Sequence, residues 1–263
     1  IATVSNTAPY LVCAIYLVLV GLAALGAAFF MDNLGNQRSN LGAMVEAMRF
    51  KHSWVMSFLY IGTFGSFIGF ASVFPKLIAD QFPEFSTLQV GTAAVSLAFL
   101  GALVGSVARP YGGKLADRFG GARMTVAAFA VMAAGALALP LTLPLGNFWV
   151  FLVCFLVLFT ATGVGNGSTY RMIPNVFHAR ALASPDAGDF TASKRKAAAA
   201  LGLISAIGAY GGFLIPQVLN ASQAATGGYS AAFYGFVGAY LVLLLMTLLV
   251  YVVPRRSLAG ERI

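Results

Sequence analysis

The sequence predicts an all-α polytopic membrane protein with seven transmembrane helices. Of its 263 residues, 59% are hydrophobic and only 9% are charged, which lies far outside the composition of soluble globular proteins. The apolar residues gather in seven stretches, each about as long as the twenty residues that cross a bilayer. The basic residues lie in the short segments between these stretches, so the net charge of +8 indicates membrane orientation and not nucleic-acid binding.

The predicted spans are separated by segments that differ strongly in charge. The spans cover residues 9–30, 53–74, 85–116, 124–143, 148–174, 197–219 and 231–253. Basic residues gather in segments 31–52, 110–123, 175–196 and 254–263, whereas segments 75–84, 144–147 and 220–230 carry only Lys76. By the positive-inside rule the first set is cytoplasmic, which puts the N-terminus outside and the C-terminus inside.

The first span is expected to be separate from the other six. Residues 32–52 form a long polar stretch that mixes charges with glycine, which predicts a cytoplasmic linker with a short surface helix over 41–48. We therefore expect a helix in residues 1–31, the linker in 32–52, and a six-helix bundle with a cytoplasmic tail in 53–263. The chain begins at Ile1 without a methionine or a basic leader, so we expect a fragment of a longer protein.

The ionisable residues argue against an enzyme. All eight carboxylates fall outside the predicted spans or at their edges, and so do His52 and His178. Cys13 and Cys154 lie inside apolar spans, where small buried residues are expected and not a disulfide or a metal site. An intramembrane enzyme would need an acid–base pair, an activated nucleophile or a metal cluster. The sequence therefore predicts no enzymatic activity, no cofactor and no metal.

Arg109 is the residue on which the interpretation of the third span depends. It is followed by a charged turn with Lys114, Asp117 and Arg118, and Asp117 is expected at the membrane surface. If the helix runs unbroken to Asp117, Arg109 lies about 12 Å inside, because a helix rises about 1.5 Å per residue. An arginine there costs about 2.5–3.5 kcal/mol and needs a polar cavity or a partner. If the helix instead ends at Pro110, Arg109 snorkels to the surface.

Two other spans place polar groups at a similar depth. Tyr60 and Phe64 share one face of the second span, and Gly202 and Ser205 are three residues apart in the sixth. Tyr60 and Ser205 each follow a lysine by nine residues, which is about 13–14 Å along a helix. Packing explains the aromatic residues and glycines equally well, so the shared depth with Arg109 is the reason to group these residues.

The fifth span contains a Gly-x-Gly-x-Gly run at 163–167. A nucleotide-binding loop of this pattern needs a preceding strand, and none is predicted here. The run therefore predicts close packing against another helix. Arg171 follows it and is expected near the cytoplasmic end of the span, with no assigned role.

Four segments resemble the NarK-type nitrate/nitrite porters of the major facilitator superfamily. They are FLYIGTFGSFIGF (58–70), ARPYGGKLADRFGG (108–121), the GNGST run of the fifth span and GLISAIGAYGGF (202–213). Within the second, GKLADRFG resembles the superfamily loop G-x-L-A-D-R-x-G. The resemblance covers nearly the whole chain and implies the major facilitator fold. The seven spans then correspond to helix 6 and the C-terminal bundle of helices 7–12, and helices 1–5 belong to a missing N-terminal half.

The resemblance also implies roles for individual residues. Arg109 resembles the substrate-binding arginine of helix 8, and Tyr60 resembles a hydrogen-bond donor of helix 7. Phe64 resembles an aromatic residue that packs against the anion. Gly202 and Ser205 fall in the nitrate signature of helix 11.

The loop of the third span is expected to act in gating. In the superfamily the loop aspartate closes the cytoplasmic side against the N-terminus of a neighbouring helix, where a negative charge is favourable. Asp117 matches this aspartate, and Gly113 and Arg118 match the loop around it.

The function implied is nitrate/nitrite antiport by rocker-switch alternating access, in a monomer of the bacterial inner membrane. A guanidinium is planar and permanently charged, so it can hold such an anion through paired hydrogen bonds. The site would lie near the midplane, between the two halves. Two alternatives stay open. The first is a nitrate–proton symporter, with the proton site in the missing half or the proton carried by the substrate. The second is a non-transporting structural subunit in which Arg109 binds a fixed carboxylate.

Overall fold

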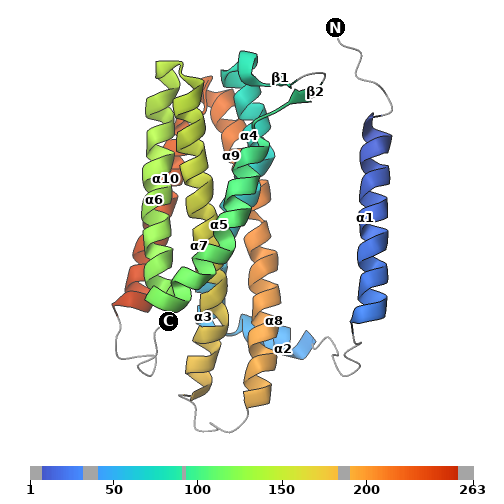
Figure 1. The fold of residues 1–263 in the computed structure, drawn as a ribbon. Helices are drawn as coiled ribbons and strands as arrows, with labels where there is room; N and C mark the ends of the chain where they lie inside the picture. The colour runs from blue at the N-terminus through green and yellow to red at the C-terminus, as the bar shows by residue number, and fades with distance from the viewer. Residues whose placement is uncertain (1–7, 32–40, 91–92, 183–189, 254–263) are drawn as a thin grey trace. The chain divides into compact units, whose positions relative to one another are not determined.

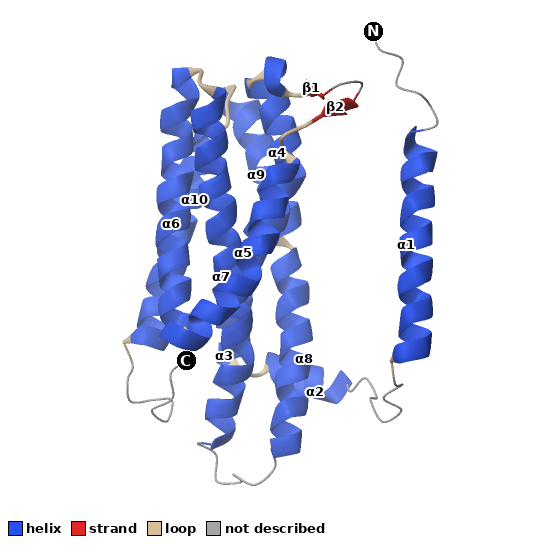
Figure 2. Ribbon diagram, in the orientation of Figure 1, coloured by secondary structure: helices blue, strands red, loops and turns tan. Residues whose placement is uncertain are grey.

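The computed structural model describes residues 8–31, 41–90, 93–182 and 190–253. The chain divides into two compact units, Ile1–Ser39 and Asn40–Ile263. The first unit holds one long helix, α1 (Ala8–Phe30), and the second holds the remaining elements (Figure 1). The described residues are almost entirely helical, as Figure 2 shows. This confirms the predicted all-α membrane fold.

The second unit is an up-and-down arrangement of long helices. Its elements in chain order are α2 (Leu41–Met48), α3 (Lys51–Tyr60), a π-helical turn (Ile61–Gly65), α4 (Ser66–Gln81), β1 (Leu88–Val90), β2 (Ala93–Val95), α5 (Phe99–Phe119), α6 (Gly121–Thr142), α7 (Phe148–Leu182), α8 (Phe190–Ala209), α9 (Gly211–Thr226), α10 (Ser230–Thr247) and a second π-helical turn (Leu248–Val252). A short 3-10 turn at Pro83–Phe85 leads from α4 to β1, and another at Leu143–Leu145 connects α6 to α7. The helix predicted over 41–48 is confirmed as α2.

Six helical segments of the described chain are long and apolar enough to cross a membrane: Cys13–Phe30, Lys51–Gln81, Gly121–Leu145, Phe148–Phe177, Ala197–Thr226 and Ser230–Val252. The remaining predicted span, the third, corresponds to α5, which is less apolar because it carries Arg109, Lys114, Asp117 and Arg118. Its 21 residues extend about 31 Å, which matches the thickness of the hydrocarbon core. The length of α5 therefore suffices for a span, although its composition is polar at one end.

The predicted start of the third span is wrong. Instead of a helix from residue 85, Leu88–Val90 pairs with Ala93–Val95 as a short antiparallel hairpin, and α5 begins only at Phe99. The segment carries β-branched residues, which favour extended backbone, and Gly91, which is a poor helix former. Its apolar composition alone could not distinguish a strand from a helix.

The other end of α5 resolves the question of Arg109. The helix continues past Pro110 to Phe119 and ends at Gly120, whose φ of 94° is a conformation that favours glycine. Gly120 N–H donates to the Ala116 carbonyl at 2.9 Å, which closes the last turn. The alternative in which the helix ends at Pro110 is therefore wrong, and Arg109 lies about 12 Å from Asp117 along one continuous helix.

Three other helices run further than predicted. Helix α4 continues through Pro75 to Gln81, α7 continues through Pro174 to Leu182, and α9 ends at Thr226. The three predicted spans end at or just before a proline or a polar residue, at residues 74, 174 and 219. A proline removes one backbone hydrogen bond, but neighbouring helices make such a loss tolerable in a membrane bundle.

Phenylalanine rings fill the core of the second unit. Phe74 of α4 stacks on Phe155 of α7 with ring centroids 4.4 Å apart, and Phe70 contacts Phe155 at 5.7 Å and Phe233 of α10 at 6.5 Å. All four side chains are fully buried. These ring contacts pack α4, α7 and α10 against one another and hold α7 in place.

Glycines bring α5 and α7 into backbone contact where the two helices cross (Figure 1). A Cβ at Gly163 would collide with the Gly105 carbonyl, and a Cβ at Gly167 would collide with the Arg109 carbonyl. At Gly112 a Cβ would meet the Val164 carbonyl. The close packing predicted for the Gly-x-Gly-x-Gly run is confirmed, and it fixes the backbone of Arg109 against α7.

Candidate functional site

Arg109 lies among aromatic side chains from two other helices. Its Nη2 donates to the Tyr60 hydroxyl at 3.4 Å. Its Cζ lies 5.6 Å from the ring centre of Phe64 and 5.6 Å from that of Tyr170. Within the described residues the ion pairs are Lys76–Asp80 and Arg171–Asp117, so neither involves Arg109. The half-buried guanidinium is held by one hydroxyl and two ring faces, and its charge is not balanced by a carboxylate of the described chain.

Tyr60 of α3 contacts residues of α5 and α8, the two other helices with polar residues predicted at its depth. Its side chain is buried, and its ring stacks on Phe64 with centroids 5.0 Å apart. Its hydroxyl accepts from Arg109, and Ser205 of α8 lies close to the same hydroxyl. The ring also fills the space beside Gly208, where a Cβ would collide with it. Arg109, Tyr60, Phe64 and Ser205 are therefore brought together.

Gly202 borders this cluster without a contact of its own. It lies three residues before Ser205 on α8, is exposed, and has no atom within 4 Å of the position that a Cβ would take. Its backbone is open, as a ligand contact would require. Its role in binding the anion stays a prediction.

The site lies where two helices lose regular geometry. The π-helical turn Ile61–Gly65 follows Tyr60 directly, and α8 gives way to α9 at Tyr210. The two irregular points meet, because the backbone of Gly65 packs against that of Gly211. Such π-helical turns are frequent at functional sites. Tyr210, which has no predicted role, is exposed at this break.

Tyr170 is a site residue that the sequence analysis missed. It comes from α7, and its ring lies 6.4 Å from that of Tyr60 as well as against Arg109. The glycine run before it predicts close packing and no polar role for this part of α7. Tyr170 follows Asn166 by four residues and shares its face of the helix, but the direction of that face follows only from the contacts of the glycines.

Asp117 pairs with a partner other than the one predicted. Its Oδ1 accepts from Arg171 Nε in an ion pair between α5 and α7, and both side chains are about half exposed. Arg171 lies far along α7, so this partner is not the helix N-terminus that the resemblance implies, and the contact with a helix N-terminus stays a prediction. Arg118 lies over the Phe119 ring at 5.2 Å, and Gly113 has only the Gly167 carbonyl near it, 4.0 Å from the position of a Cβ.

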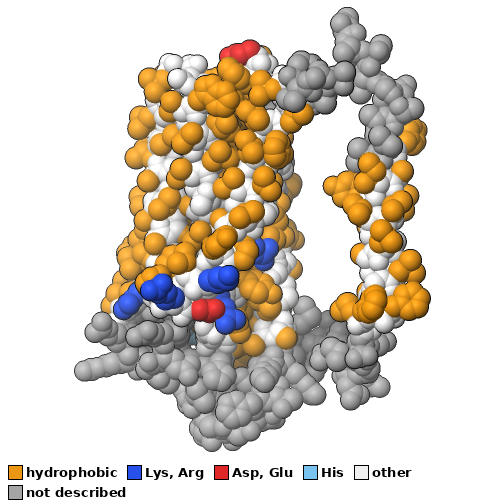
Figure 3. All heavy atoms as spheres, in the orientation of Figure 1, with side chains coloured by type: hydrophobic (Ala, Val, Ile, Leu, Met, Phe, Trp, Pro, Cys, Tyr) orange, Lys and Arg blue, Asp and Glu red, His pale blue; other side chains and the backbone are white. Residues whose placement is uncertain are grey.

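The described Lys and Arg side chains on the face drawn in Figure 3 gather toward one end of the second unit. Asp117 belongs to a segment predicted as cytoplasmic, and Arg171 is predicted near the cytoplasmic end of its span.

We expect Asp117→Asn to slow turnover while leaving anion affinity nearly intact, because the Asp117–Arg171 pair lies about 12 Å from Arg109 and holds α5 to α7. Transport rates at several nitrate concentrations test this. The same change in Arg171→Gln supports gating, and a large loss of affinity with an unchanged maximal rate contradicts it.

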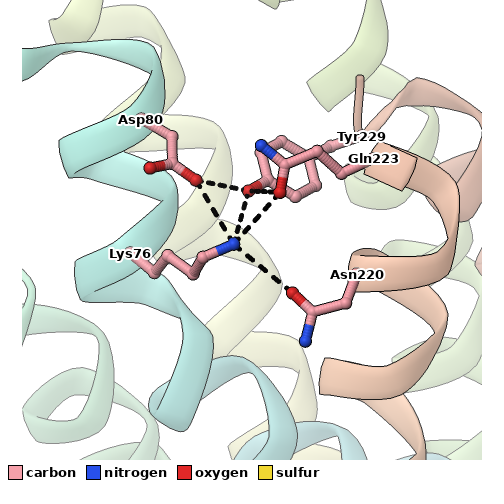
Figure 4. Close-up of polar contacts among 5 residues, drawn as sticks. All are labelled: Lys76, Asp80, Asn220, Gln223 and Tyr229. Carbon is pink, nitrogen blue, oxygen red and sulfur yellow. Dashed lines mark hydrogen bonds and ion pairs between the residues drawn. The ribbon is translucent and has the colours of Figure 1, made fainter. Parts of the chain in front are cut away.

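A second polar cluster lies at the C-terminal end of α4. It connects α4 to α9 and to Tyr229, which lies just before α10 (Figure 4). Lys76 Nζ donates to Asn220 Oδ1 at 3.3 Å, to Gln223 Oε1 at 3.0 Å and to the Tyr229 hydroxyl at 3.2 Å. The Tyr229 hydroxyl in turn donates to Asp80 Oδ2. Burial and then the Asp80 carboxylate raise the pKa of Tyr229, so the hydroxyl keeps the proton that it donates.

We expect Tyr229→Phe to lower the free energy of unfolding by about 1–2 kcal/mol, because it removes a buried hydroxyl that contacts three side chains. Tyr234→Phe is the matched control, since Tyr234 is on the same helix end, is exposed and should change stability by less than about 0.5 kcal/mol. Denaturation of the two purified variants in detergent measures both. Equal effects would mean that the cluster contributes nothing.

Comparison with known proteins gives one family and several relatives. The model of the Major Facilitator Superfamily matches residues 1–216. The nitrate/nitrite transporter NarU of Salmonella typhimurium is 40% identical over 246 residues, which cover 90% of this chain and 52% of NarU. NarU of Escherichia coli is 38% identical over the same shares. The probable nitrate/nitrite antiporter NarK2 of Thermus thermophilus is 37% identical over 206 residues, 77% of this chain and 42% of NarK2. The chain spans about half the length of these relatives.

Proposed function

Because the chain belongs to the Major Facilitator Superfamily, we propose that it forms the C-terminal half of a nitrate/nitrite transporter. The superfamily consists of transporters, which agrees with the prediction that the chain is not an enzyme. In this proposal α1 is helix 6, residues 32–52 are the central linker, and the helices from α3 onward are helices 7–12. The relatives NarU and NarK2, whose names carry nitrate and nitrite, support the substrate.

The observation that carries the proposal is the guanidinium of Arg109. Within the described residues it has a hydroxyl and two aromatic faces but no carboxylate, so its charge is available to an anion. Nitrate and nitrite are small and planar or bent, so one edge of a guanidinium can donate two parallel hydrogen bonds to two of their oxygens. We propose that Arg109, Tyr60 and Ser205 bind the anion, that Phe64 packs against it, and that Gly202 leaves room for it.

Exchange of one anion for another follows from the same charge. A guanidinium in a water-poor cavity is costly when the cavity is empty, and an anion relieves that cost. An empty carrier would therefore change conformation slowly, and a loaded one would change it rapidly. The carrier would expose the site alternately to either side by rocking its two halves, with the pair Asp117–Arg171 acting in the cytoplasmic closure.

The setting of the carrier is part of the proposal. We place it as a monomer in the bacterial inner membrane, with the C-terminus in the cytoplasm, because the basic segments gather on that side. Its partners are the lipid bilayer, the nitrate and nitrite anions, and an N-terminal half that supplies the other wall of the site.

Counterflow in proteoliposomes tests this function. The complete transporter is reconstituted with unlabelled nitrate inside, and uptake of labelled nitrite is followed with and without an imposed proton gradient. Exchange predicts uptake that requires internal anion and ignores the gradient. Uptake that requires the gradient and no internal anion identifies a symporter, and no uptake under either condition contradicts transport.

A further inference from the structure

Asn166 is a buried polar side chain for which the structure gives no partner. The residue is 1% exposed, in the middle of α7. Its Oδ1 and its Nδ2 are both buried without a hydrogen bond, and among the described residues they are the side-chain atoms of which this is true. Buried amides are nearly always satisfied, since an unmade hydrogen bond destabilises the folded protein. An unpaired donor and acceptor together point to a bound group.

The place of Asn166 on α7 identifies the site that it faces. It lies seven residues after Phe159 and four before Tyr170, so the three side chains share one face of the helix. The Phe159 ring contacts Phe67 of α4 at 6.2 Å, and the Tyr170 ring contacts Arg109. Asn166 thus lies between an aromatic contact on one side and the Arg109 cluster on the other.

The neighbouring glycines bracket the same face. Gly163 and Gly167 pack against the backbone of α5, and Gly165 packs against Thr63 in the π-helical turn. The face of Asn166 lies between these two directions, toward the space enclosed by α5 and the irregular part of the second span. Arg109 and Phe64 border that space from the two sides.

We propose that Asn166 is a further ligand of the oxyanion at Arg109, and that it donates from Nδ2 to an anion oxygen. The inference rests on the proposed function. A carboxamide suits this position because it donates strongly but carries no charge, so it stabilises the anion without making the empty site more cationic. Its Oδ1 is left to accept from a hydroxyl or a water that enters with the anion.

Two variants separate a ligand from a structural residue. Asn166→Leu has a similar size and removes both unpaired groups, and Asn166→Asp has the same shape but repels an anion. Without anion, Asn166→Leu should melt at or above the wild-type temperature, because an unsatisfied buried amide has been removed. Ser168→Ala is the matched control, since Ser168 is on another face of α7 and bonds to Thr125.

Thermal melting of the complete transporter against nitrate, with chloride at equal concentration as reference, gives the result. We expect the apparent affinity for nitrate to fall at least tenfold in Asn166→Leu, further in Asn166→Asp, and to stay unchanged in Ser168→Ala. Wild-type affinity in either Asn166 variant overturns this inference and leaves the proposed function standing. A wild-type protein that responds to neither nitrate nor nitrite overturns both.

Discussion

Replacing Arg109 with lysine is expected to abolish nitrate/nitrite exchange, although the positive charge is kept. The guanidinium lies over the Phe64 and Tyr170 rings and reaches the Tyr60 hydroxyl at the same time, which its flat shape permits. A lysine has a compact ammonium on a flexible stem and cannot reproduce paired contacts with an anion. Loss of one charge-assisted hydrogen bond of about 1.5–3 kcal/mol lowers affinity roughly ten- to more than a hundredfold.

The measurement for Arg109→Lys is the counterflow of labelled nitrite against internal nitrate. Arg123→Lys serves as the matched control, because Arg123 is exposed at the start of α6 and should tolerate the change. Near-normal exchange by both variants would mean that Arg109 acts as a charge at the surface, since both side chains snorkel equally well. That outcome would remove Arg109 from the site.

Gly167→Ala is expected to destabilise the bundle by about 1–3 kcal/mol and to weaken anion binding as well. The added methyl group would collide with the carbonyl of Arg109, which is backbone and cannot turn aside. Helices α5 and α7 would have to separate, and Arg109 would move away from Tyr60 and Tyr170. The stability loss and the affinity loss therefore have one cause.

Gly235→Ala on α10 is the control for this change, because nothing lies within 4 Å of the position of its Cβ. There alanine should be neutral or mildly stabilising, since it favours a helix more than glycine does. Unfolding in denaturant and nitrate-dependent melting of the two variants are compared. If Gly167→Ala changes stability and nitrate affinity no more than Gly235→Ala does, α5 and α7 pack less tightly than described above.

The sequence predicts the helices well because hydropathy and charge are averages over many residues. Single long apolar stretches give α6, α7 and α10 within a few residues, apart from the far end of α7. The hairpin of Leu88–Val90 and Ala93–Val95 is not predicted, because a short apolar run with β-branched residues fits a strand and a helix equally well. Pro110 leaves an early end of α5 open as an alternative, but the helix continues through it, because neighbouring helices make the lost backbone hydrogen bond tolerable.

The candidate site is predicted in part, because depth follows from a count of residues but the facing direction does not. Residue counts along the helices place Arg109, Tyr60 and Ser205 at one depth, and the structure brings their side chains together. Tyr170 and Asn166 needed the rotation of α7 about its axis, which only the contacts of the glycine run reveal. The Arg171 partner of Asp117 belongs to a helix distant in sequence, and no local pattern indicates it.

A structure of the complete transporter with bound nitrite would show where the anion lies. We expect density for the anion within about 3 Å of the Arg109 guanidinium nitrogens, a normal distance for a charge-assisted hydrogen bond, with the Tyr60 hydroxyl beside it. Nitrite bound elsewhere, with Arg109 paired to a carboxylate of the N-terminal half, would mean that Arg109 does not bind the anion.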